Sequence, residues 1–279
     1  MLFELHCHSG YSRGRKIPTE ALASPGEIVN RAKQLGIGGI AITDHDSVNS
    51  WKEGALEARK QGILFIPASE ISSSNGHILG FGLTEAVRPG LGVGETVDRI
   101  RAQGGIAVAA HPFDIKGDGI KYGIRKTDAV EAFNAVALDR LTNRFCERKA
   151  RKLGKPMIAG SDAHTLDMIG TAPNMINEDT LEGVLKKIKS GKVRYLKRYV
   201  PVKEAIYWSR ERMIRSEIDI RVYIRRHYGF PKSPVSRFLL NRFLTSRRER
   251  PWLWLGRFGM GMTALYAGLR VLGYQTLGR

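Results

Sequence analysis

The sequence predicts an α/β protein, a barrel of alternating strands and helices followed by a small basic helical extension. Three observations support this fold class. Short apolar runs alternate with segments of helical periodicity up to about residue 195. Seven of these runs have the length and bounding residues of strands, and the composition changes at Pro201. Seven strands with intervening helices indicate a barrel of the (β/α) kind.

The elements follow one another regularly. The expected strands are residues 2–6, 38–43, 63–69, 77–83, 105–110, 128–133 and 156–160, and a short run at 193–196 closes the series. The expected helices are residues 25–36, 49–60, 94–103, 138–153 and 178–190. The first helix has the clearest signal, because Ser24 is a typical N-cap, Pro25 suits the first helical position and Glu27 completes a capping box.

The chain divides into two parts by composition. Residues 1–200 form the expected barrel domain, and residues 201–279 form the basic helical extension. The extension holds 16 Lys+Arg and 5 Asp+Glu, so it carries +11 of the total net charge of +18. In it Ile214, Ile218 and Val222 lie on one helical face, and Ser233 with Pro234 predicts the start of a further helix.

Charge and cysteine content narrow the class of protein. A net charge of +18 favours anionic partners: phosphorylated small molecules, nucleic acid or an anionic membrane surface. The two cysteines, Cys7 and Cys146, are unlike a disulfide framework and suit a reducing compartment. We find neither a signal peptide nor an apolar run long enough to span a bilayer. These features predict a cytoplasmic protein.

Histidines and carboxylates recur at the ends of the predicted strands. Side chains two residues apart in a strand point the same way, so His6 and His8 present both imidazoles to one side. In an α/β barrel the strand ends converge on one rim. Six of the seven histidines and two carboxylates therefore meet there; these are His6, His8, His45, Glu70, His77, His111, Asp162 and His164. The seventh, His227, lies in the basic extension. The pattern predicts a multinuclear metal site.

The motifs resemble those of a known family. They are His6-x-His8, Thr43-Asp44-His45-Asp46, Glu70 with His77, His111-Pro112 and Gly160-Ser161-Asp162-Ala163-His164. In this order, over residues 1–175, they are similar to the PHP (polymerase and histidinol phosphatase) superfamily. The resemblance implies a distorted (β/α)7 barrel, two or three divalent metals and hydrolysis of phosphate esters.

The resemblance also implies an assignment of ligands. His6, His8, Glu70 and Asp162 would hold one metal. Glu70 would bridge to a second metal, bound by His77 and His111, and His45 with His164 would hold a third. Imidazole and carboxylate ligands suit Zn, Mn or Fe better than Mg.

The chain departs from the family at Arg13. Many members carry an acidic or histidine ligand of the third metal there, and a guanidinium cannot bind a cation. Arg13 is therefore a candidate catalytic and substrate-binding residue that clamps a phosphate oxygen; the alternative is a solvated side chain. Asp44 either orients His45 as part of the catalytic site or is a turn residue. Lys116 and Lys121, in the loop after His111, either bind the substrate or are solvated.

Three roles for the extension remain open. Arginines interleaved with aromatic residues fit nucleic-acid binding. The apolar segment after Arg250, within residues 247–277, fits peripheral contact with a membrane. A helical cap packed on the barrel is the third possibility. The leading function is thus hydrolysis of a phosphomonoester or phosphodiester. The alternatives are a nuclease that acts on DNA or RNA, its strand held by the extension, and a non-catalytic barrel that binds nucleic acid.

Overall fold

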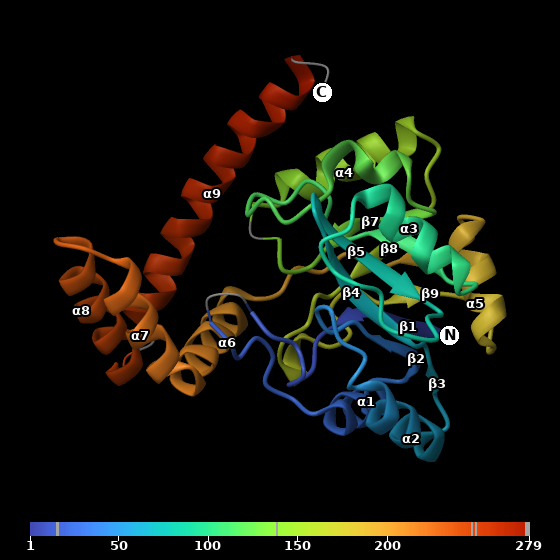
Figure 1. The fold of residues 1–279 in the computed structure, drawn as a ribbon, viewed down its shortest axis with the longest axis horizontal. Helices are drawn as coiled ribbons and strands as arrows, with labels where there is room; N and C mark the ends of the chain where they lie inside the picture. The colour runs from blue at the N-terminus through green and yellow to red at the C-terminus, as the bar shows by residue number, and fades with distance from the viewer. Residues whose placement is uncertain (15–16, 138, 247, 249, 277–279) are drawn as a thin grey trace.

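A computed structural model describes residues 1–276 except residues 15–16, 138, 247 and 249. Its strands form two five-stranded sheets (Figure 1). The first sheet has the order β10-β9-β1-β2-β3, with β1 at Leu2–Cys7, β2 at Ile37–Ile42, β3 at Leu64–Phe65, β9 at Asn174–Met175 and β10 at Arg194–Tyr195. The second has the order β4-β5-β6-β7-β8, with β4 at Ala68–Ser73, β5 at Gly76–Phe81, β6 at Ile106–Ala109, β7 at Ala129–Asn134 and β8 at Met157–Gly160.

Helices flank both sheets. They are α1 (Pro25–Gln34), α2 (Trp51–Gln61), α3 (Val93–Ala102), α4 (Leu141–Lys152) and α5 (Leu181–Lys189), with short 3-10 turns at Lys121–Arg125 and Leu166–Met168. The predicted capping box of α1 is confirmed, because the Ser24 hydroxyl accepts from the Glu27 backbone N–H and the Glu27 carboxylate accepts from Ser24. These caps satisfy backbone donors that a helix start would otherwise leave open.

The two sheets meet at the rim that carries the predicted ligands. A bridge pairs Cys7 of β1 with Ala163, just after β8, and another pairs His45, after β2, with Glu70 of β4. The expected α/β class with a helical C-terminal region is confirmed. Continuous strand pairing does not close the described strands into one barrel; the sheets join through these single-residue bridges instead.

One part of the predicted topology was wrong. The strand expected at residues 63–69 is two strands, β3 and β4, and β4 pairs antiparallel with β5, not parallel. The connection is only Ser74 and Asn75, which is too short for a crossover helix. Gly76, at φ +136°, closes the turn in a conformation that a side chain would disfavour. Because β5 is antiparallel to β4, the start of β5 lies at the ligand rim. His77 therefore reaches the site from the start of a strand.

Four helices follow the sheets. They are α6 (Val202–Arg215), α7 (Glu217–His227), α8 (Lys232–Thr245) and α9 (Arg250–Thr276), and in Figure 1 α9 stands out from the rest as a long rod. Ile214 and Ile218, expected on one face of a single helix with Val222, lie in two different helices, α6 and α7, which are separated at Ser216. Their exposed fractions are 41% and 79%. Among the described residues, the helices include none that is both long and apolar enough to cross a membrane.

Candidate metal centre

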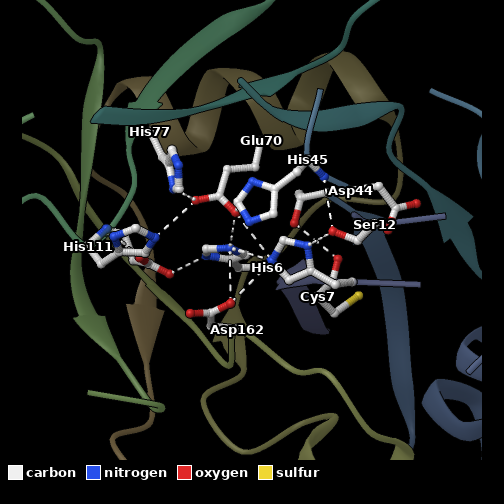
Figure 2. A network of polar contacts seen from close by, with 12 residues as sticks. His6, Cys7, Ser12, Asp44, His45, Glu70, His77, His111 and Asp162 are labelled. Carbon is white, nitrogen blue, oxygen red and sulfur yellow. Dashed lines mark hydrogen bonds and ion pairs between the residues drawn. The ribbon is translucent and has the colours of Figure 1, made fainter. Parts of the chain in front are cut away.

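All eight predicted ligands lie together at the rim where the two sheets meet. Figure 2 shows most of them converging on one small volume from strands of both sheets. The arrangement follows from the backbone. His6 lies in β1 and His8 directly follows that strand, and both residues are almost fully buried. His111 and Asp162 follow β6 and β8 at φ +25° and +50°, a region that non-glycine residues rarely adopt and that is frequent at functional sites.

Glu70 lies at the centre of the cluster. Its Oε2 is 3.2 Å from Nε2 of His6, 3.2 Å from Nε2 of His8 and 3.5 Å from Nδ1 of His45. Its Oε1 is 3.0 Å from Nδ1 of His77 and 3.0 Å from Nε2 of His111. Five imidazole nitrogens thus lie within 3.5 Å of the two carboxylate oxygens of Glu70.

Asp162 forms the second focus of the cluster. Its Oδ1 is 3.5 Å from Nε2 of His6, 3.2 Å from Nε2 of His8 and 3.8 Å from Nδ1 of His164. Ligand atoms lie within 4.8 Å of one another in four overlapping groups. The groups are His6–His8–Glu70, His6–His111–Asp162, His8–Asp162–His164 and His45–Glu70–His77. They bring His45 close to Glu70 and His77, and they bring His164 close to Asp162 and His8.

The electrostatics of the site favour added positive charge. Burial alone would raise the pKa of Glu70, but His45, His77 and His6 together lower it well below the usual value. Burial would lower the pKa of His8, yet Asp162 and Glu70 raise it to about 10. The buried carboxylates therefore stabilise cations beside them, which is the condition that a metal ion fulfils.

Unpartnered imidazole nitrogens give a second test of fit. Nδ1 of His45, His77 and His111 is buried, and none of the three makes a hydrogen bond within the described part of the chain. Nδ1 of His77 lies 3.0 Å from Glu70 without the alignment that a hydrogen bond needs. Buried polar atoms are rarely left unpaired in native proteins. Nδ1 of His45 and of His77 faces Glu70, so divalent metals would satisfy these two lone pairs, whereas His111 turns Nε2 towards Glu70. The residues present therefore fit a multinuclear metal centre.

Glu131 in β7 is a site residue that the sequence analysis missed. It is 1% exposed, and its Oε1 is 2.7 Å from Nδ1 of His6. Its Oε2 accepts the backbone N–H of His111 at 2.7 Å. Glu131 therefore fixes the His6 tautomer that leaves Nε2 free for a metal. Gly160 makes room for it, because a Cβ there would lie 1.8 Å from Oε1 of Glu131. An acidic residue inside an otherwise apolar strand was the available signal.

Glu20 was also missed, and its carboxylate lies beside His45. Its side chain is 14% exposed, with Oε2 3.6 Å from Nε2 of His45. The Ser12 hydroxyl donates to the same oxygen at 3.1 Å and lies 3.2 Å from Nδ1 of His8. Burial would raise the pKa of Glu20, but the charges of His45, His164 and His8 lower it. Glu20 thus adds an acidic side chain on the His45–His164 side of the cluster.

Helix α6 of the extension forms one wall of the site. Trp208 is 8% exposed, and its ring centroid lies 4.3 Å from that of His164. The Trp208 indole N–H donates to the backbone oxygen of Glu20 at 2.6 Å. The Arg212 guanidinium lies 4.8 Å from the Trp208 ring centroid. Burial lowers the pKa of Arg212 while Glu20 opposes that shift. Sequence periodicity carried no sign that the extension reaches the ligands.

The two predicted catalytic residues lie differently. Asp44 is fully buried, and its carboxylate accepts the backbone N–H of Ser9 at 2.6 Å and the Ser9 hydroxyl at 2.7 Å. Asp44 therefore holds the loop after β1 in place, and its bonds do not orient the His45 ring. The Arg13 side chain is exposed on that loop, where its backbone forms a bridge with Thr19.

The two predicted substrate-binding lysines, Lys116 and Lys121, are exposed in the loop after His111. The loop lies against the site, since the backbone N–H of His77 donates to the oxygen of Asp118 at 2.7 Å. Lys121 lines a surface hollow together with Asn75, Tyr122 and Lys126. Among the described contacts, neither lysine touches a ligand residue. Their part in substrate binding remains a prediction.

The fold and the site together define the class. A mixed α/β chain with six histidines and two carboxylates gathered at one rim has the side chains that a divalent metal centre requires. Comparison with known families gives the same result. Residues 4–125 match the PHP domain, and residues 140–193 match the PHP-associated family. The chain belongs to the PHP family, and it is a hydrolase of the phosphoesterase type.

Relatives cover different shares of the chain. An uncharacterized protein of Methanocaldococcus jannaschii is 34% identical over 159 residues, 54% of this chain and 92% of the relative. A 5'-3' exoribonuclease of Haemophilus influenzae is 36% identical over 72 residues, 26% of this chain and 24% of the relative. A 3',5'-nucleoside bisphosphate phosphatase of Chromobacterium violaceum is 36% identical over 95 residues, 33% of this chain and 30% of the relative. The chain thus matches less than a third of the length of either enzyme.

A solved structure has a similar fold. It is a two-domain protein from Bacteroides vulgatus that contains a predicted PHP-like metal-dependent phosphoesterase, with a TM-score of 0.58 and 18% identity. The match covers 71% of this chain and 65% of that chain. At this identity the likeness concerns the fold alone.

Proposed function

We propose that the protein hydrolyses phosphomonoesters or phosphodiesters of phosphorylated small molecules with two or three divalent metal ions. The observation that carries the proposal is the position of Glu70, whose two carboxylate oxygens lie 3.0–3.5 Å from nitrogens of five histidines. Such a donor set suits Zn, Mn or Fe better than Mg. Bound metals would supply a hydroxide near neutral pH and neutralise charge on the phosphate.

The chain's own residues would prepare the site for this chemistry. Glu131 holds the Nδ1 proton of His6, so that Nε2 faces the cluster. Ser12 contacts Nδ1 of His8 in the same way. Trp208 covers the ring of His164 and keeps water from that side. Arg212, half-buried over the Trp208 ring, would bind a phosphate oxygen of the substrate.

Two findings support a small phosphorylated substrate. Trp208 packs against the ring of His164 and would limit the space beside it for a long strand. The nucleoside bisphosphate phosphatase relative acts, by its name, on a small phosphate ester, and its similarity covers 33% of this chain.

The two sheets would form the halves of a distorted (β/α)7 barrel. We retain the cytoplasm as the proposed compartment, because Cys7 and Cys146 are buried free thiols.

A nuclease is the second candidate, and two specific observations favour it. The exoribonuclease relative is 36% identical over its 72 matched residues, and residues 201–279 carry a net charge of +11. Arginines of the extension would then hold the phosphates of a strand. A non-catalytic barrel is less well supported, because a site without catalysis has no physical need for six convergent histidines.

Metal analysis combined with an activity screen tests the proposal. Purified wild type should hold at least two divalent ions per chain and hydrolyse chromogenic phosphomonoesters or phosphodiesters, nucleotides or sugar phosphates. Glu70→Gln should lose most of the metal and the activity, because it removes the proposed bridge. Activity confined to oligonucleotides would favour the nuclease instead. A wild-type protein without metal, or full metal occupancy in Glu70→Gln, would refute the site assignment.

A further inference from the structure

Helix α9 exposes a continuous apolar stripe to solvent. Its members recur every three or four residues and therefore lie along one side of the helix; they are Trp254, Phe258, Met262, Leu265 and Leu269. Each is more than half exposed, and Trp254 and Leu269 reach 74% and 71%. A row of large apolar side chains in water is costly, and in folded proteins it commonly marks an interaction surface.

The opposite side of α9 is already occupied by the protein. Ala267 is fully buried, and a Cβ at Gly256 would lie 3.0 Å from the Ile206 side chain of α6. Arg270 donates to the backbone oxygens of Asp114 and Ile115, in the loop that follows His111. These contacts fix the rotation of α9 about its own axis, so the exposed stripe faces the solvent. It is not the side that packs on the barrel.

The surroundings of the stripe are basic. Helix α9 contains no Asp or Glu, and Arg248, Arg250 and Arg257 are exposed at or near its first turns. The whole chain has a net charge of +18. An apolar helix face with tryptophan and arginine at its start is the pattern of a helix that lies in the plane of a membrane interface.

We propose that the α9 stripe is a peripheral membrane-binding surface for anionic lipids. The apolar side chains would enter the boundary between headgroups and acyl chains, and the arginines would contact lipid phosphates. At about 1.5 Å per residue, 27 residues give a helix of about 40 Å that can lie along the surface. The contact of Arg270 with the loop after His111 would hold the metal centre at a fixed distance from the bilayer.

Charge argues for lipid over a second copy of the chain. An anionic surface attracts each of the exposed arginines, whereas two chains of +18 repel one another. Nucleic acid would satisfy the arginines but would leave the leucines of the stripe in water. Only a surface that is both anionic and apolar meets both groups.

Co-sedimentation with vesicles tests the proposal. The full-length protein is mixed with vesicles of phosphatidylcholine and phosphatidylglycerol in equal parts, or of phosphatidylcholine alone. We expect binding to the anionic vesicles that weakens as salt rises. The double variant Leu265→Glu/Leu269→Glu should lower the partition coefficient at least about a hundredfold, since it puts charges in place of two aliphatic chains that would enter the bilayer.

Leu56→Glu is the matched control. Leu56 is 57% exposed on α2 of the barrel domain, so this variant adds a charge at a similarly exposed leucine away from the stripe. It should bind vesicles like the wild type. Tryptophan emission should shift to shorter wavelength on anionic vesicles, and Trp254→Phe should reduce that shift while binding persists.

Three results would overturn the proposal. The first is a wild-type protein that does not co-sediment with anionic vesicles. The second is a double variant that binds them as well as the control does. The third is a wild type that is a dimer in ultracentrifugation without lipid and does not bind vesicles, together with a double variant that is a monomer. That result would assign the stripe to a second copy of the chain.

Discussion

Replacing Glu131 by glutamine should weaken metal binding without unfolding the protein. Both oxygens of Glu131 are in use: Oε1 contacts Nδ1 of His6 and Oε2 accepts the backbone N–H of His111, each at 2.7 Å. An amide has only one oxygen, so its NH2 group must face one of these two donors in either orientation. His6 then loses the partner that holds Nε2 towards the metal, or His111 loses its backbone anchor.

The expected size of the effect comes from similar partners of metal-bound histidines. Their removal weakens metal affinity about 10–100-fold, or about 1.4–2.7 kcal/mol. The loss of the Glu131 charge acts in the same direction, because that charge raises the pKa of His6 against the effect of burial and so favours a cation there. We therefore expect a change near the upper end of this range.

Competition with a chelator measures the affinity, and circular dichroism checks the fold. Glu95→Gln is a suitable control, because Glu95 is 52% exposed and pairs only at 3.8 Å with Arg99 on α3. It should match the wild type. If Glu131→Gln also holds metal like the wild type, Glu131 does not set the orientation of His6, and the reasoning from these two contacts is wrong.

Substitutions at Glu20, Arg212 and Trp208 test other parts of the site. Glu20→Gln should lower the metal content by about one ion and leave the Glu70 cluster loaded, as measured by elemental analysis; an unchanged count would exclude Glu20 as a ligand. Arg212→Ala should lower turnover about a hundredfold or more. The loss should be larger than in Arg13→Ala, because Arg212 is half-buried over the Trp208 ring and Arg13 is exposed. A larger loss in Arg13→Ala in rate assays would favour Arg13 as the residue that binds the phosphate. Trp208→Ala should lower the free energy of unfolding by about 3–5 kcal/mol and disturb the His164 side of the cluster. In denaturant titrations Trp208→Phe should recover most of that stability. An equal loss of stability in both variants would attribute the effect to the hydrogen bond with Glu20 and not to packing.

Local rules made much of this protein predictable from its sequence. The capping box at Ser24 and Glu27 depends on residues three apart, so α1 could be located within a residue or two. Side chains alternate in an extended segment, which places His6 of β1 and His8, directly after it, on one side whatever surrounds them. Ligands that follow strands must gather where the strands end. For this reason the eight residues could be grouped before their positions were known, although their roles as ligands remain predictions.

Contacts between distant segments decided the rest. Glu131 lies 125 residues from His6, and Trp208 lies 188 residues from the Glu20 backbone that accepts its N–H. No local period relates such pairs, because the chain brings them together only when β7 and α6 pack against β1 and its loop. The antiparallel direction of β5 follows from the two-residue connection after β4, which the repeated βα pattern did not indicate. The sequence by itself determined which side chains could bind metal. Only tertiary packing decided which carboxylates orient them, which helix covers them and which face of α9 is left in water.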